Sequence, residues 1–379
     1  MNTERCVEMR LVPVNSIKEG SILAKTIYNS TGVPLLREGY PLNKRLIDRA
    51  LDNGVYSLYI HDKYSDEIIE DVISPELRQK AVRTLKDTFR DMHNDMFAQK
   101  TRKFQKNEKS RQSVEQITSL AKNFVDDVLS NRDVIVNLVD IKTMDDYTYQ
   151  HCVNTAVLSI VLGLGLGYSR KALESVAAGA LLHDFGKVFV SKELLLKPDR
   201  LTDDEMEHIK NHPQLGYDYL KETNVLDGIA LSVILEHHEK ADGTGYPEGR
   251  NTVSISPYAK LLSICDVYDA LTSDRPYRAA MSPNEALELI MGSCGDTFDL
   301  ELVKNFIERI VPYPVGSMVE LSNNKKAVIH RLNPEYALRP VVKVIVDESG
   351  DDEVVFEELD LLQKTDVVIT NIYREEQIS

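Results

Sequence analysis

Residues 176–187 read VAAGALLHDFGK. The first seven residues are small and apolar, as expected for the buried end of a helix packed among other helices. The run then ends in His183 and Asp184, two polar side chains placed where burial without a partner costs several kcal/mol. A metal ion satisfies both groups. This stretch therefore predicts a helical domain with a metal site.

The same combination of an apolar run and metal-ligating residue types recurs along the chain. His237 and His238 end the apolar run 229–235, and Asp266 lies within LLSICDV, residues 261–267. A single histidine of this kind is more often a hydrogen-bonded core residue than a ligand. Five histidines and two aspartates in separate helices favour a metal site, and their imidazoles and carboxylates suit iron, manganese or zinc. The candidates are His151, His183, Asp184, His212, His237, His238 and Asp266.

Four regions follow from the hydrophobic pattern, and they predict a multidomain, mainly α fold. Residues 1–65 are expected to form a small α/β module, and residues 74–135 a helical connector that begins at Ser74-Pro75-Glu76. Residues 136–312 read as nearly all helix. Residues 313–379 contain short β-rich runs separated by polar turns, which predict a β-rich appendage.

The composition narrows the classes of function. The chain has 379 residues and a formal net charge of -15, which argues against a nucleic acid polymer as the partner. Its four cysteines form no CxxC pair, and the N-terminus lacks an apolar signal segment. The longest apolar run, residues 155–168, is shorter than the ~20 residues of a membrane span. The sequence thus predicts a cytoplasmic protein with no membrane span.

Three longer motifs resemble those of the HD-GYP family of the HD phosphohydrolase superfamily. HDFGK at residues 183–187 resembles HDxGK, and HHEKADGTGYP at residues 237–247 resembles HHExxDGxGYP. DVYDALTSDRPYR at residues 266–278 resembles DxxDALTSxRxYR/K. The motifs occur in the family's order, and the resemblance covers about residues 136–312. It implies an all-helical HD-type metal-binding bundle flanked by the N-terminal α/β module and the C-terminal β-rich appendage.

The resemblance also implies a composition for the metal centre. The seven candidates above would bind two divalent metal ions, most readily iron or manganese, and Asp184 would bridge them. Some members hold a third metal with a Glu four residues before the first ligand histidine. That position is Tyr147 in this chain, which favours two metals.

The substrate implied by the resemblance is cyclic di-GMP, which would be hydrolysed to pGpG, with slower cleavage to GMP, by a hydroxide that bridges the metals. Asp184 and Lys187 are the expected catalytic residues, with Lys187 binding phosphate or stabilising the leaving group. Asp269 is expected to hold an arginine or accept from guanine. Tyr246 would stack on guanine or form a hydrogen bond to phosphate, or else be purely structural. The predicted substrate contacts are Lys187, Gly245, Tyr246, Pro247, Asp269, Arg275 and Arg278.

Two other functions remain open on the sequence alone. One is a catalytically silent receptor for cyclic di-GMP that acts as a protein-interaction module. The other is an HD hydrolase of a different cyclic dinucleotide. GGDEF-type or other signalling proteins and a second copy of the chain are further expected partners. The N-terminal module and the connector are expected to regulate access to the site.

Overall fold

The computed structural model describes most of the chain between residues 9 and 372. Within that span it leaves out residues 15–16, 29–33, 53–56, 63, 66–71, 99–107, 131–146, 196, 198, 274–280, 282, 310–312, 314, 334–335, 337 and 348–354. Arg275 and Arg278, two of the predicted substrate contacts, therefore lie outside the described residues.

The N-terminal module is a small α/β unit, in line with its strand-like runs. Its three-stranded sheet has the order β1-β5-β2, and a separate pair joins β3 to β4. Asn43 caps α1, because its Oδ1 accepts from the amide of Leu46 at 3.0 Å. The strand-like run at residues 21–28 forms two short strands rather than one. The elements are β1 (Arg10–Pro13), β2 (Ile22–Leu23), β3 (Ile27–Tyr28), β4 (Pro34–Leu36), α1 (Lys44–Asp52) and β5 (Ser57–His61).

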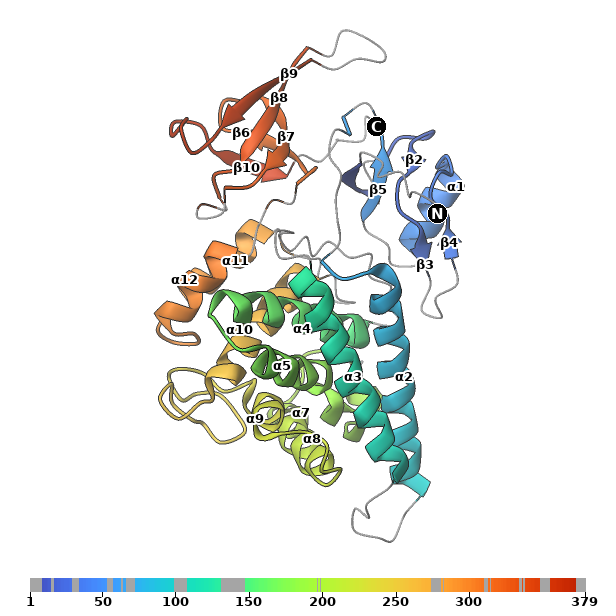
Figure 1. The fold of residues 1–379 in the computed structure, drawn as a ribbon, viewed down its shortest axis with the longest axis vertical. Helices are drawn as coiled ribbons and strands as arrows, with labels where there is room; N and C mark the ends of the chain where they lie inside the picture. Colours follow the sequence, from blue (N-terminus) through green and yellow to red (C-terminus); the bar gives the residue numbers. More distant parts are fainter. Residues whose placement is uncertain are drawn as a thin grey trace.

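The middle of the chain is a helical bundle (Figure 1). None of its described helices is both long and apolar enough to cross a bilayer. The elements are α2 (Pro75–Ala98), α3 (Glu108–Ser130), α4 (Tyr147–Gly165), α5 (Arg170–Leu182), the 3-10 helix η3 (Phe185–Phe189), α6 (Lys192–Leu195), α7 (Asp203–Lys210), α8 (His212–Lys221), α9 (Gly228–Glu236), α10 (Pro257–Thr272), α11 (Pro283–Gly292) and α12 (Leu300–Arg309).

The two helices expected as a connector share one hydrophobic core with the rest of the bundle. Leu85 and Phe89 of α2 and Ile117 and Phe124 of α3 are buried in the same cluster as the apolar residues of α4, α5 and α10. Figure 1 shows α2 and α3 running side by side along the bundle. The packing therefore crosses the expected boundary at residue 135, and that boundary stays a prediction.

The C-terminal region is a five-stranded antiparallel sheet of order β10-β6-β7-β8-β9. Its own core contains Val319, Ile329 and Val342. Tyr64, just beyond β5, packs with Met318 and Val328 of this sheet, so the N-terminal module and the sheet touch. The strands are β6 (Met318–Leu321), β7 (Lys326–Arg331), β8 (Val341–Asp347), β9 (Val355–Asp360) and β10 (Ile369–Ile372).

Candidate metal centre

The bundle brings all seven predicted ligands together from five separate helical segments. His151 lies in α4, Asp266 lies in α10, and His212 begins α8. The other four occupy helix ends, His183 and Asp184 after α5 and His237 and His238 after α9. Two triads have donor atoms within 4.8 Å of one another. We call them triad A (His151, His183 and Asp266) and triad B (His212, His237 and His238).

Asp184 lies between the two triads. Its Oδ1 is 3.6 Å from Nε2 of His183 in triad A and 3.4 Å from Nε2 of His212 in triad B. Within triad A, Nε2 of His151 is 2.9 Å from Oδ1 of Asp266. Within triad B, Nε2 of His212 is 3.3 Å from Nε2 of His237. One carboxylate oxygen therefore faces both groups.

Main-chain carbonyls fix the orientation of three of these imidazoles. Nδ1 of His183 is 2.7 Å from the carbonyl oxygen of Ala180, and the equivalent distances at His212 and His237 are both 2.8 Å. A carbonyl only accepts, so each Nδ1 carries the proton and donates it. Each Nε2 is then left with a lone pair directed into the centre, as in histidines that ligate metals.

Unpartnered buried atoms support the fit of this donor set to divalent cations. Nε2 of His183 and Oδ1 of Asp184 are buried, and no described group forms a hydrogen bond with either atom. Leaving such atoms unpaired costs free energy that a cation between them would recover. These buried imidazole and carboxylate groups lie close enough to one another to hold divalent ions.

The charge states also suit a cation. Burial lowers the pKa of His183 and, more strongly, of His237, and it lowers the pKa of His238 to about 3. These imidazoles are therefore neutral and able to ligate. Burial by itself would raise the pKa of Asp184, but the Lys187 ammonium beside it holds that pKa well below its usual value. The centre thus combines neutral nitrogens with an anionic carboxylate.

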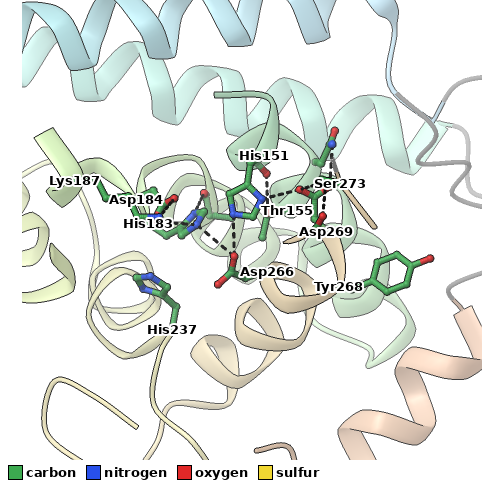
Figure 2. Close-up of polar contacts among 12 residues, drawn as sticks. His151, Thr155, His183, Asp184, Lys187, His237, Asp266, Tyr268, Asp269 and Ser273 are labelled. Carbon is green, nitrogen blue, oxygen red and sulfur yellow. Dashed lines mark hydrogen bonds and ion pairs between the residues drawn. The ribbon is translucent and has the colours of Figure 1, made fainter. Parts of the chain in front are cut away.

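His151 differs from the other histidines because it lies between two carboxylates. Its Nε2 faces Asp266, and its Nδ1 is 2.6 Å from Oδ2 of Asp269 (Figure 2). Although burial opposes it, hydrogen bonding to these two aspartates raises the pKa of His151 to about 9. Asp269 thus lies behind the metal centre, where its described contacts orient a candidate ligand.

Gly186 explains why a glycine follows the HD pair. A β-carbon at this position would lie 1.8 Å from the carbonyl oxygen of His212 and 2.9 Å from the amide of Gly216. Only a residue without a side chain lets η3 cross α8 at this separation. The close crossing brings His212 up to Asp184.

Lys187 projects back onto the centre. Its Nζ donates to Oδ2 of Asp184 at 2.6 Å, on the oxygen opposite the one that faces the triads. Its side chain is one-third exposed, and the electrostatic field of Asp184 raises its pKa even though burial opposes this. The ammonium group of Lys187 is therefore held at the edge of the centre, where a phosphate can reach it.

Glu239 ties the loop of residues 245–250 to the end of α9. Its two carboxylate oxygens accept from the amides of Glu248 and Arg250, each at 2.8 Å. Gly245 approaches the same backbone so closely that a β-carbon would lie 2.4 Å from the amide of Lys240. The role of Gly245 in the described structure is this close approach. Glu239 belongs to the HHExxDGxGYP motif but was not among the predicted site residues.

Tyr246 lies over triad B. Its ring centroid is 4.7 Å from that of His238 at an interplanar angle of 32°, and Nζ of Lys210 lies 5.9 Å from the ring centroid. The bond from Tyr246 to Pro247 is cis. Burial raises the pKa of the Tyr246 phenol, so the hydroxyl is neutral and can donate to an anion.

Cys152 also borders the centre, although it was not among the predicted site residues. Its sulfur lies within 4.8 Å of donor atoms of His183 and Asp184, and the residue is fully buried. Burial raises the pKa of the Cys152 thiol well above its usual value, so the sulfur keeps its proton. Its position directly after His151 in an apolar helix was the available signal.

Comparisons with known proteins agree with this geometry. A family model described as "HD domain" matches residues 97–302, and one described as "KOW domain associated with HD domain" matches residues 318–379. The cyclic di-GMP phosphodiesterase PA4108 of Pseudomonas aeruginosa is 36% identical over 231 residues, which are 60% of this chain and 56% of the relative. The 3'3'-cGAMP-specific phosphodiesterase 1 of Vibrio cholerae is 32% identical over 173 residues, 45% of this chain and 39% of the relative.

A solved structure shares the fold. The HDG"Y"P protein Bd1817 from Bdellovibrio bacteriovorus superposes with a TM-score of 0.52 at 19% identity, covering 79% of this chain and 98% of that one. The chain spans about half the length of PA4108 and less of the Vibrio protein. The first family model covers more than half of the chain, and its match includes all seven gathered ligands. The chain therefore belongs to the HD domain family, and it carries the HD-GYP signature.

Proposed function

We propose that this protein is a metal-dependent phosphodiesterase that hydrolyses cyclic di-GMP to pGpG. The observation that carries the proposal is the position of Asp184, whose Oδ1 faces triad A and triad B at 3.6 and 3.4 Å. Such an arrangement suits two divalent ions with one bridging carboxylate, and iron or manganese fits the mixed nitrogen and oxygen donors. The similarity to PA4108 supports the choice of substrate.

Bound divalent ions would activate water and neutralise phosphate charge in an in-line displacement. The protein's own groups would then place the substrate. Lys187 would hold a phosphate oxygen at the edge of the centre, and Tyr246 would border the pocket over His238. The Glu239 carboxylate would keep the Tyr246 loop in position through its bonds to Glu248 and Arg250.

The test is to purify the full chain with iron or manganese, count metals per chain, and follow conversion of cyclic di-GMP to pGpG. Asp184→Asn keeps the side-chain size and removes the charge that faces both triads, so it should lower metal content and abolish turnover. His208→Asn is the matched control, because His208 is exposed on α7. Loss of metal by chelation should stop turnover, and added manganese should restore it. A fully metallated protein that leaves cyclic di-GMP intact would refute the proposal.

A second candidate is hydrolysis of another cyclic dinucleotide. The similarity to the Vibrio relative named as specific for 3'3'-cGAMP favours it. The ligands would be the same, and only contacts to the bases would differ. A comparison of kcat/KM for cyclic di-GMP and 3'3'-cGAMP on one metallated preparation decides between them. A silent receptor would instead bind cyclic di-GMP tightly without turnover.

The remaining expectations concern location and assembly. We propose that the protein acts in the cytoplasm with GGDEF-type or other signalling proteins, and that it forms a homodimer. The substrate is an intracellular signal in this reading, and the N-terminal module and connector would regulate access to the site. Fractionation of cells and light scattering on the purified chain test the location and the dimer.

A further inference from the structure

A chain of hydrogen bonds runs from α2 to the metal centre. The Nη1 of Arg78 donates to Oδ1 of Asn154 at 2.8 Å. The Nδ2 of Asn154 donates to Oδ1 of Asp269 at 3.0 Å, and Oδ2 of Asp269 is 2.6 Å from Nδ1 of His151. Four residues from α2, α4 and α10 thus form a continuous polar path that ends on a candidate ligand.

Burial protects the hydrogen bonds of this path from exchange with water. Asn154 is fully buried and Asp269 is 2% exposed, so water does not readily replace these bonds. Asn154 accepts from the guanidinium on one side and donates to the carboxylate on the other, which fixes the orientation of its amide. The amide in turn fixes the Asp269 carboxylate that holds Nδ1 of His151. Groups that orient a ligating imidazole in this way tune metal affinity.

The start of the path is placed where the N-terminal region enters the bundle. Arg78 lies in the first turn of α2. Val72 and Ile73, just before the helix, are buried in the bundle core, and Ser74 donates from both its amide and its hydroxyl to Asp127 of α3. A displacement of the start of α2 would therefore move Arg78 relative to Asn154.

We propose that Arg78 and Asn154 are positioning residues for His151, and that they couple the start of α2 to metal binding at the catalytic centre. The proposal rests on the proposed function in that His151 is taken as a metal ligand. It adds a route by which the preceding module regulates the centre. Neither residue belongs to the gathered ligands, and both act through Asp269.

The experiment measures the dissociation constant for Mn²⁺ by competition with a chromophoric chelator, using the full chain. Asn154→Leu and Arg78→Met should each raise that constant by about tenfold. Arg78→Lys keeps the charge and should restore part of the affinity. Arg83→Met is the matched control, because Arg83 is an exposed arginine on the same helix, and it should bind Mn²⁺ like the wild type.

The double variant tests whether Arg78 and Asn154 act along one path or independently. If Arg78 acts through Asn154, adding Arg78→Met to Asn154→Leu should cause little further loss of Mn²⁺ affinity, because the path is already interrupted at Asn154. Circular dichroism of the metal-free proteins checks folding. Arg78→Met alone keeps the proposal testable if the buried Asn154→Leu change prevents folding, since Arg78 is only partly buried.

Two results would overturn the proposal: equal Mn²⁺ affinity in Arg78→Met and Arg83→Met, or fully additive losses in the double variant. Both readouts use metal alone. Failure of the wild type to cleave cyclic di-GMP would reject the proposed function and leave this measurement intact. An unchanged Mn²⁺ constant with active wild type would reject only the path from α2.

Discussion

Gly186 of η3 and His212 at the start of α8 pack backbone to backbone, with room for nothing larger than hydrogen between them. The carbonyl oxygen of His212 lies 1.8 Å from where a β-carbon of Gly186 would be. Triad B reaches Asp184 only because this crossing is so close. The packing of η3 on α8 and the position of triad B are therefore set by the same contact.

Gly186→Ala should destabilise the protein by more than about 3 kcal/mol, since overpacking against backbone cannot be relieved by a side-chain rotation. Metal content should fall with it, because η3 and α8 must separate. Gly228→Ala is the control, as a β-carbon there meets nothing within 4 Å. Thermal melting and metal analysis of both variants check this. Equal melting temperatures would mean that the crossing is looser than described.

Lys187→Met should lower kcat for cyclic di-GMP by about 10²- to 10³-fold, the range seen when a preorganised charge contact is removed from a transition state. The metal content should stay near that of the wild type, because Oδ1 of Asp184 still faces the triads. Lys171→Met, at an exposed position on α5, is the control. Steady-state kinetics with metal analysis test the effect. A kcat equal to that of the wild type would show that Lys187 does not contribute to catalysis.

Glu239→Gln replaces a carboxylate that accepts from two amides by a group that can accept through only one oxygen. One partly buried amide then loses its acceptor, at about 0.5–1.5 kcal/mol. The Tyr246 loop should loosen, raising KM for cyclic di-GMP by about tenfold with metal content unchanged. Glu222→Gln, at an exposed position beyond α8, is the control. An unchanged KM would show that the loop does not position substrate.

The C-terminal sheet should lose stability in alkali through Tyr313. Burial, with a smaller contribution from Glu288, raises the pKa of Tyr313 to about 12. The unfolded chain releases this proton near pH 10, so unfolding becomes more favourable between pH 10 and pH 12, by about 1.4 kcal/mol per pH unit. Tyr313→Phe should flatten this slope in denaturant titrations. Tyr336→Phe, at an exposed tyrosine, should not.

The ligands could be found from sequence because their chemistry conflicts with their surroundings. His183, His237 and Asp266 interrupt or end apolar runs, and burial there requires a partner. Helix α10 begins at Pro257 directly after Ser256, a pair that is typical of a helix start. These features are local, so one sequence suffices to read them.

The features that the sequence did not predict depend on contacts between distant segments. The close crossing of η3 and α8 was not predicted, although Gly186 and Gly216 meet there backbone to backbone. Asp269 was expected to hold an arginine or guanine, and its contacts with Asn154 and His151 depend on how α10 lies against α4. No periodicity specifies that register between helices.

The shared core of α2, α3 and the HD helices has a consequence for how such proteins can be recombined. A hybrid joined near residue 130 would strip Phe89, Ile117 and Phe124 from the interior and expose apolar faces of α4 and α5. The natural junction for grafting a foreign sensor lies upstream, ahead of Val72. Transplanted input modules should therefore be fused there, so that the whole helical unit travels with its own hydrophobic lining.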